Sequence, residues 1–119
     1  MKIAVTAKGT TLAAEVDPRF GRAPYILIID TETMLFEALD NSANVNAFKG
    51  AGIQAATTVA DKEVEVLLTG YCGPNAFKTL EAAGLKVVCD ISGTVQDTVN
   101  AFMAGKLVYS SGPNAEGHW

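Results

Sequence analysis

The sequence is poor in the side chains that most often bind metal ions in proteins. Histidine occurs only once, as His118, and the two cysteines are Cys72 and Cys89. Neither cysteine lies in a CxxC or CxxH spacing, so a structural zinc site is not expected. Two cysteines are too few for a disulfide scaffold, and we expect both to be free thiols. The lone histidine excludes a catalytic triad or a histidine-rich metal site in the folded core.

Basic residues and long apolar runs are also scarce. The chain has 9 lysines and arginines against 13 aspartates and glutamates, a net charge of -4 and a pI near 4.8. Extended nucleic-acid binding is excluded, because it needs a basic surface that displaces counterions from the phosphates. No apolar stretch approaches the roughly 20 residues that span a bilayer, and the N-terminus lacks the apolar length of a signal peptide. We therefore expect a cytoplasmic protein without nucleic-acid or membrane partners.

The hydrophobic residues that are present, 49% of the 119, are enough to form the core of one domain. Their spacing predicts strands at 2–6, 25–29, 34–39, 64–68 and 85–91, and helices at 50–61, 74–83 and 94–104. The end of the chain has no such periodicity. We expect a single domain over residues 1–109 and a mobile tail over residues 110–119.

The order of these elements predicts an α/β fold. Three strands come first, the second of them in a hairpin, and helices then alternate with strands, which calls for right-handed crossovers between parallel strands. We predict a ribonuclease-H-like three-layer fold: a five-stranded mixed sheet of order 3-2-1-4-5, with strand 2 antiparallel and helices on both faces. In that arrangement all the helices begin at the carboxyl edge of the sheet.

Cations and glycines are predicted to gather at this edge. The cations are Lys8, Arg19, Arg22 and Lys49, and the glycines are Gly50, Gly52, Gly70, Gly73 and Gly93. Glycines let an anion approach helix N-termini, whose free amides carry a partial positive charge. The alternative interpretation is that Arg19 pairs with Asp17, Arg22 is solvated, and the glycines only form turns.

The segment TGYCGPNAF, residues 69–77, places Cys72 between two glycines just before a predicted helix. This position predicts a lowered thiol pKa and ligation of a soft metal, although a small residue in a tight turn would fit equally well. Cys89 is expected to be an apolar filler. The string GAGIQA at 50–55 does not predict a dinucleotide fold, because a polar connection leads into the glycines where a strand is required.

Three segments, VDPRFGRAPYILIID, GAGIQAATTVAD and LLTGYCGPNAFKTLEAAGLKVV, resemble in this order the dinitrogenase iron-molybdenum cofactor biosynthesis family. The resemblance extends from residue 1 to about residue 108. It implies non-enzymatic binding, carriage or storage of an anionic metal-sulfur cluster: a molybdenum-copper sulfide cluster or a related iron-molybdenum-sulfur cofactor precursor. The matching positions are Arg19, Phe20, Gly21, Arg22, Gly50, Gly52, Gly70, Cys72, Gly73 and Pro74.

Many members of that family carry histidine where this chain has Tyr71. The tyrosine favours a cluster held by charge, amide hydrogen bonds and apolar contact, with Phe20 and Tyr71 as walls of the site. We predict that the cluster contacts Lys8, Arg19, Phe20, Arg22, Gly50, Gly52, Gly70, Tyr71, Cys72 and Gly73. Cys72 is the candidate metal ligand, and no catalytic residue is expected.

Two other functions remain open. The domain could be a metal-independent interaction or regulatory module, since members of the family are linked with ATPases of the Mrp/MinD type and with cofactor-assembly proteins. An oxidoreductase that uses Cys72 is the third hypothesis, although no resolving cysteine lies near it in the sequence.

Overall fold

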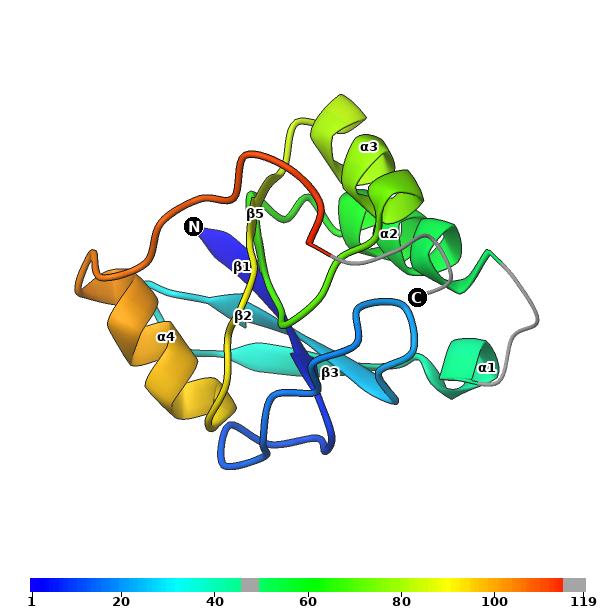
Figure 1. The fold of residues 1–119 in the computed structure, drawn as a ribbon. Helices are drawn as coiled ribbons and strands as arrows, with labels where there is room; N and C mark the ends of the chain where they lie inside the picture. Colours follow the sequence, from blue (N-terminus) through cyan, green and yellow to red (C-terminus); the bar gives the residue numbers. More distant parts are fainter. Residues whose placement is uncertain (46–49, 115–119) are drawn as a thin grey trace.

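The computed structural model describes residues 1–45 and 50–114, which form an α/β fold around one mixed sheet (Figure 1). The elements follow in the order β1 (Lys2–Ala7), β2 (Tyr25–Asp30), β3 (Phe36–Asp40), α1 (Ser42–Val45), α2 (Ala51–Asp61), β4 (Val66–Leu68), α3 (Pro74–Ala82), β5 (Lys86–Val88) and α4 (Val95–Met103).

The sheet has the predicted order, β3-β2-β1-β4-β5. Strand β2 runs antiparallel to both β1 and β3, whereas β4 is parallel to β1 and to β5. The predicted α/β fold, the strand order and the reversal of the second strand are therefore confirmed.

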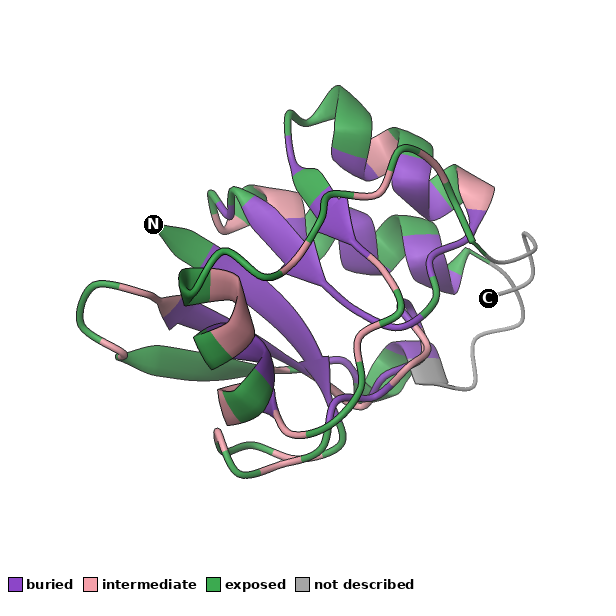
Figure 2. Ribbon diagram, turned by 60° about the vertical axis from the view of Figure 1, so that its left-hand side comes forward, coloured by how far each residue is buried: buried purple, intermediate pink, exposed green. Residues whose placement is uncertain are grey.

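Helices cover both faces of the sheet because its central strands are apolar on both sides (Figure 2). In β1, Ala4 packs in one core cluster with α2 and α3, while its neighbours Ile3 and Val5 pack in a second cluster with α4. Side chains alternate between the faces of a strand, so one short apolar run supplies both cores. The result is the expected three-layer arrangement.

Several boundaries differ from the prediction because single residues adopt left-handed backbone conformations. Met34 has φ 61°, so β3 begins only at Phe36. Asp90 has φ 63° and bends the chain after β5, which is much shorter than the predicted strand. Helix α1, a single turn, was not predicted. No helix in the described ranges has the length and apolar character that a membrane span requires.

The segment after α4 returns across the end of the sheet and passes along β5 (Figure 1). Ser110 donates its amide to the Val87 carbonyl at 2.7 Å, and Asn114 bonds to the loop after β4. The predicted tail thus begins inside a hydrogen-bonded segment. Residues 115–119, with His118, lie outside the described part of the chain, so the mobility of the tail stays a prediction.

Candidate functional site

Two of the predicted binding segments lie side by side at the carboxyl edge of the sheet. The loop that follows β1 reaches the loop between β4 and α3, where Arg19 and Tyr71 form a parallel bridge. The Phe20 amide donates to the Tyr71 carbonyl at 3.1 Å, and the Tyr71 amide donates to the Pro18 carbonyl. Backbone pairing therefore holds these two segments together independently of their side chains.

Glycines allow these loops to approach one another closely. A Cβ on Gly70 would stand 2.6 Å from the Cα of Pro18, and a Cβ on Gly21 would stand 2.8 Å from the backbone nitrogen of Gly52. Both distances are shorter than real Cβ contacts. Gly21 also has φ 98°, which favours glycine. The first turn of α2 is thus packed on the same loop, and all three predicted segments meet.

Two buried threonines support the meeting point from below. Thr6, at the end of β1, and Thr69, just after β4, lie 2.8 Å apart through their hydroxyl oxygens. The Thr6 hydroxyl also donates to the Asp17 carbonyl at 2.7 Å, and the Asp17 amide donates to the Thr6 carbonyl. The sequence did not single out either threonine, because a polar residue at the end of a strand is typical of an ordinary strand boundary.

Asn41 supports the loop after β1 from the other side. Its side-chain amide donates to the carbonyls of Gly21, at 3.2 Å, and Ala23, at 2.8 Å. Asn44 in turn donates to the Asn41 side-chain oxygen at 2.7 Å. Both asparagines are buried. Their only signal in the sequence is a polar cluster directly after a strand, which is also typical of an ordinary turn.

Arg19 is paired with Asp17, as the alternative interpretation predicted. Its guanidinium Nε lies 3.4 Å from Asp17 Oδ1, and its backbone amide donates to the same oxygen at 2.9 Å. The Asp17 carboxylate is buried, whereas the Arg19 side chain is 43% exposed. The Arg22 amide donates to the Arg19 carbonyl at 3.1 Å, and this bond closes the turn between the two arginines. The Arg19 guanidinium is therefore held in place by Asp17 and remains partly accessible to solvent.

A third predicted cation, Lys8, does not join this group. Lys8 forms an exposed ion pair with Glu15, 3.5 Å apart, and Glu15 bridges to Thr94 at the start of α4. This pairing places Lys8 on the α4 side of the loop. Lys49 lies outside the described residues.

Cys72 is completely buried, and its thiol belongs to the core cluster between the sheet and the α2/α3 layer. Burial raises the pKa of the Cys72 thiol to about 12, and the nearby Cys89 thiol adds to the increase. The predicted lowering of this pKa is therefore wrong, because desolvation outweighs the helix N-terminus. Cys89 is half-buried against the same cluster, and burial raises its pKa too.

The two aromatic residues predicted as walls of the site differ in accessibility. Phe20 is completely buried in the core cluster, where it anchors its loop. Tyr71 is 42% exposed. Of these two rings, therefore, the one that offers an apolar surface to a molecule at this edge is that of Tyr71.

The three helix N-termini at the edge are not equivalent. The first amides of α4 already have partners, since Val95 donates to Ala14 and Gln96 donates to Leu12, both at 2.9 Å. In the first turn of α3, the amides of Asn75 and Ala76 donate to no other described residue. Helix α2 begins after Gly50, which has φ 81°. Among the described hydrogen bonds, amides for a ligand are thus expected from α3 and not from α4.

Side chains that could complete a metal site are scarce here. Across residues 1–45 and 50–114, no three histidine, cysteine, aspartate or glutamate side chains come together as a metal-binding group. The site instead combines backbone amides, glycine-lined backbone, an accessible tyrosine ring and arginine. Such donors suit an anion with polarizable surface atoms better than a bare cation.

The model of the dinitrogenase iron-molybdenum cofactor family matches residues 1–105 of this sequence. The chain belongs to this family. The match includes every segment that meets at the carboxyl edge, and it confirms the resemblance noted from the sequence motifs. Membership in this family supports a cofactor-related role.

Solved structures of relatives agree with this assignment. The apo form of the orange protein from Desulfovibrio gigas is 48% identical, with a TM-score of 0.93 and 96% of each chain covered. A NifB-like protein of the DUF35 family from Thermotoga is 37% identical, with a TM-score of 0.83 and 98% of each chain covered. A further relative is known by its sequence: an uncharacterized protein from Methanocaldococcus jannaschii is 26% identical over 110 residues, 90% of this chain and 89% of that protein.

Proposed function

We propose that this family member binds and carries an anionic molybdenum-containing metal-sulfur cluster at the carboxyl edge of its sheet. The cargo would be a molybdenum-copper sulfide cluster or a precursor of the iron-molybdenum cofactor. The protein would bind and carry it without catalysing a reaction. The observation that carries the proposal is the convergence of the Arg19–Arg22 turn, the N-terminus of α2 and the loop before α3. The name of the family, which refers to the iron-molybdenum cofactor, supports the same class of ligand.

The chemistry of the edge matches that of a thiometallate. Such an anion carries several negative charges on large polarizable sulfur atoms, so it is best held by cations, amide donors and apolar contact together. Arg19 supplies charge, the first turn of α3 supplies amides, and the exposed ring of Tyr71 supplies an apolar surface. Exclusion of water on binding would strengthen the charge and hydrogen-bond contributions.

Direct ligation by Cys72 is the less favourable mode of binding. A metal ligand must be a thiolate, and this thiol is buried and protonated at neutral pH. Binding through Cys72 would require the loop before α3 to open. We therefore propose that the cargo is held by non-covalent contacts, while Cys72 packs beneath them.

Reconstitution of the purified protein tests the proposal. After addition of tetrathiomolybdate and copper, we expect sulfide-to-metal charge-transfer absorption to stay with the protein through gel filtration. Arg19→Gln should reduce the retained cargo about tenfold, because it removes a positive charge beside a highly charged anion. A colourless wild-type protein after gel filtration would refute the proposal.

The matched control is Lys86→Gln, which removes one positive charge from an exposed residue at the opposite end of the sheet. This variant should retain as much cargo as the wild type. Equal losses in both variants would mean that net charge, and not the edge site, governs retention. Metal analysis of protein isolated from its own cell would then show which metals it carries without reconstitution.

A partner for the transfer step stays open. ATPases of the Mrp/MinD type and cofactor-assembly proteins are the partner classes that the family resemblance implies. Pull-downs that use apo-protein and reconstituted protein in parallel would show whether such a partner recognises the loaded state. A partner that binds both forms equally would favour the interaction-module hypothesis.

A further inference from the structure

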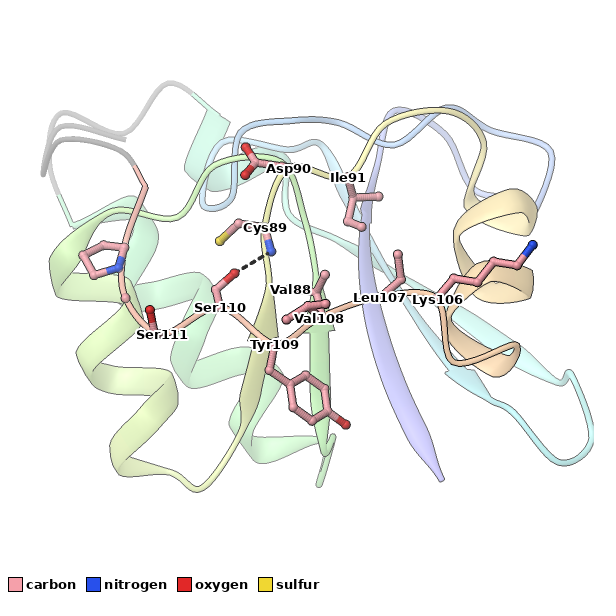
Figure 3. A pocket seen from close by; sticks show the side chains of 12 residues that line it. Val88, Cys89, Asp90, Ile91, Lys106, Leu107, Val108, Tyr109, Ser110 and Ser111 are labelled. Carbon is pink, nitrogen blue, oxygen red and sulfur yellow. Dashed lines mark hydrogen bonds between the residues drawn. The ribbon is translucent and has the colours of Figure 1, made fainter.

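The segment that follows α4 lies across β5 as a strap, defined here as residues 106–114. A cavity of about 580 Å³ lies between this strap and the sheet, lined on the strap side by residues 106–113 (Figure 3). Leu107 packs against the second core cluster, but Val108 is 82% exposed, so beyond Leu107 the strap buries little apolar surface. Specific hydrogen bonds therefore hold the part of the strap that follows Val108.

The first attachment is Ser110. Its amide donates to the Val87 carbonyl at 2.7 Å, and its hydroxyl accepts a bond from the Cys89 amide at 3.0 Å (Figure 3). These bonds partly cover the outer edge of β5. They lie some distance along the chain from the loop before α3 and do not touch it.

The second attachment is Asn114, which bonds directly to the loop before α3. Its side-chain oxygen accepts a bond from the Cys72 amide at 2.8 Å, and its backbone amide donates to the Cys72 carbonyl at 3.1 Å. Its side-chain nitrogen donates to the Gly70 carbonyl at 2.9 Å and to Asp90 Oδ1 at 3.2 Å. One residue thus satisfies both backbone groups of Cys72 and also bonds to Gly70.

The loop before α3 is consequently held between two segments. On one side, Pro18 and Phe20 pair with Tyr71, and on the other side Asn114 pairs with Cys72. Asn114 takes the place that a neighbouring strand would have in a sheet. Tyr71 is held on the first of these sides and Cys72 on the second, and both residues lead directly into the first turn of α3.

We propose that Asn114 is a positioning residue for the cargo site: it holds residues 70–72 in the conformation that receives the cluster. This inference rests on the proposed function. Because coupling between two binding events is reciprocal, cargo that prefers the held loop must also strengthen the attachment of the strap. The C-terminal segment therefore reports whether the site is loaded, and release of Asn114 weakens the grip on the cargo.

Hydrogen exchange and cargo titration of the same variants test this proposal. In Asn114→Ala, we expect the Cys72 amide to exchange about tenfold faster and tetrathiomolybdate with copper to bind about tenfold more weakly, because a solvent-accessible set of hydrogen bonds is lost. In the wild type, loading should slow exchange of the Cys72 and Ser110 amides. The melting temperature should change little.

Two further variants sharpen the test. Asn114→Asp keeps the acceptor for the Cys72 amide, but it cannot donate to the Gly70 carbonyl and adds a negative charge beside Asp90. Its cargo affinity should fall below that of Asn114→Ala. Ser111→Ala is the matched control, since Ser111 is exposed on the same strap and forms no hydrogen bond with any described residue. It should behave as the wild type in both measurements.

The outcomes separate this inference from the proposed function. If the wild type binds cargo and Asn114→Ala binds it equally well, the positioning role is wrong and the proposed function stands. A lower melting temperature with faster exchange throughout α3 and β5 would show a purely structural role and would also overturn the inference. If the wild type binds no cargo, the proposed function fails, and unchanged Cys72 exchange in apo Asn114→Ala would refute the held loop as well.

Discussion

The N-termini of α3 and α4 begin at the same edge of the sheet, yet they are used differently. At α4, the Thr94 hydroxyl accepts from the Asp97 amide, and loop carbonyls accept from Val95 and Gln96. At α3, Gly73 is the N-cap, has no side-chain cap and is followed by Pro74. The protein's own chain satisfies one helix start and leaves the other accessible to a ligand.

This difference shows that the position of a helix N-terminus does not by itself define an anion site. The partial charge of a helix resides on its unpaired terminal amides, so a loop that accepts their hydrogen bonds also removes the binding capacity. In this fold, the loop after β1 contacts both helix starts. Its residues 12–14 close the start of α4, and its residues 18–20 line the loop before α3.

The largest expected effect comes from replacing, by alanine, the glycines that lie before these two helices. Gly70→Ala would force a Cβ against the backbone of Pro18, 2.6 Å away, and should lower the free energy of unfolding by about 3 kcal/mol. A Cβ on Gly93, on the α4 side, would only reach ordinary contact with Asp97 Oδ2 at 3.8 Å, so Gly93→Ala should cost about 1 kcal/mol through its φ of 96°. Urea denaturation compares the two. Equal costs would mean that the loops do not pack as closely as described.

The second effect is a loss of stability at alkaline pH that depends on Cys72. Burial raises its pKa from the ordinary 9.0 to about 12, so the folded state keeps a proton that the unfolded state releases. This stabilisation is complete below pH 9.0 and is lost as the pH rises toward 12. Between about pH 9 and about pH 10.5 the free energy of unfolding should fall by about 2 kcal/mol.

Cys72→Ala provides the control for this pH dependence. It removes the titrating thiol but keeps the other groups that ionise in the same range, so the difference between the two proteins isolates Cys72. Denaturant unfolding at several pH values measures it. Parallel pH profiles would indicate that the thiol is accessible to water in the folded protein, contrary to its burial.

The smallest expected effect is that of Thr94→Ala. Loss of the N-cap hydrogen bond at α4 should lower the free energy of unfolding by about 1 kcal/mol. The affinity for tetrathiomolybdate and copper should not change, because the α4 amides contact the protein's own loop. A clear loss of affinity would place the cargo on the α4 side of the edge and would reverse the comparison.

Much of the fold could be predicted from the sequence because apolar spacing and chain order restrict the possible topologies. The alternation in β1 serves two cores, and the helix–strand alternation after Gly50 requires parallel neighbours. The missed boundaries arose at Met34 and Asp90, where non-glycine residues adopt positive φ. Local propensity disfavours that conformation, so the sequence carries little sign of it.

The site was predictable in its segments but not in its details. The motifs around Arg19, Gly52 and Gly70 marked the loops that meet. The depth of Cys72 depends on how α3 packs on the sheet, and this depth decides the direction of its pKa shift. Asn114 bonds to a loop 42 residues earlier in the chain, and a contact at that separation leaves no local pattern.

The pairing of Arg19 with the buried Asp17 has a consequence for residence time. Asp17 already neutralises part of the positive charge of Arg19. A bound anion therefore gains less electrostatic binding energy from Arg19 than from an unpaired cation. A carrier protein must release its cargo to an acceptor, and an anion that dissociates too slowly would not be transferred. For the proposed cargo, Asp17 would thereby favour transfer over long retention.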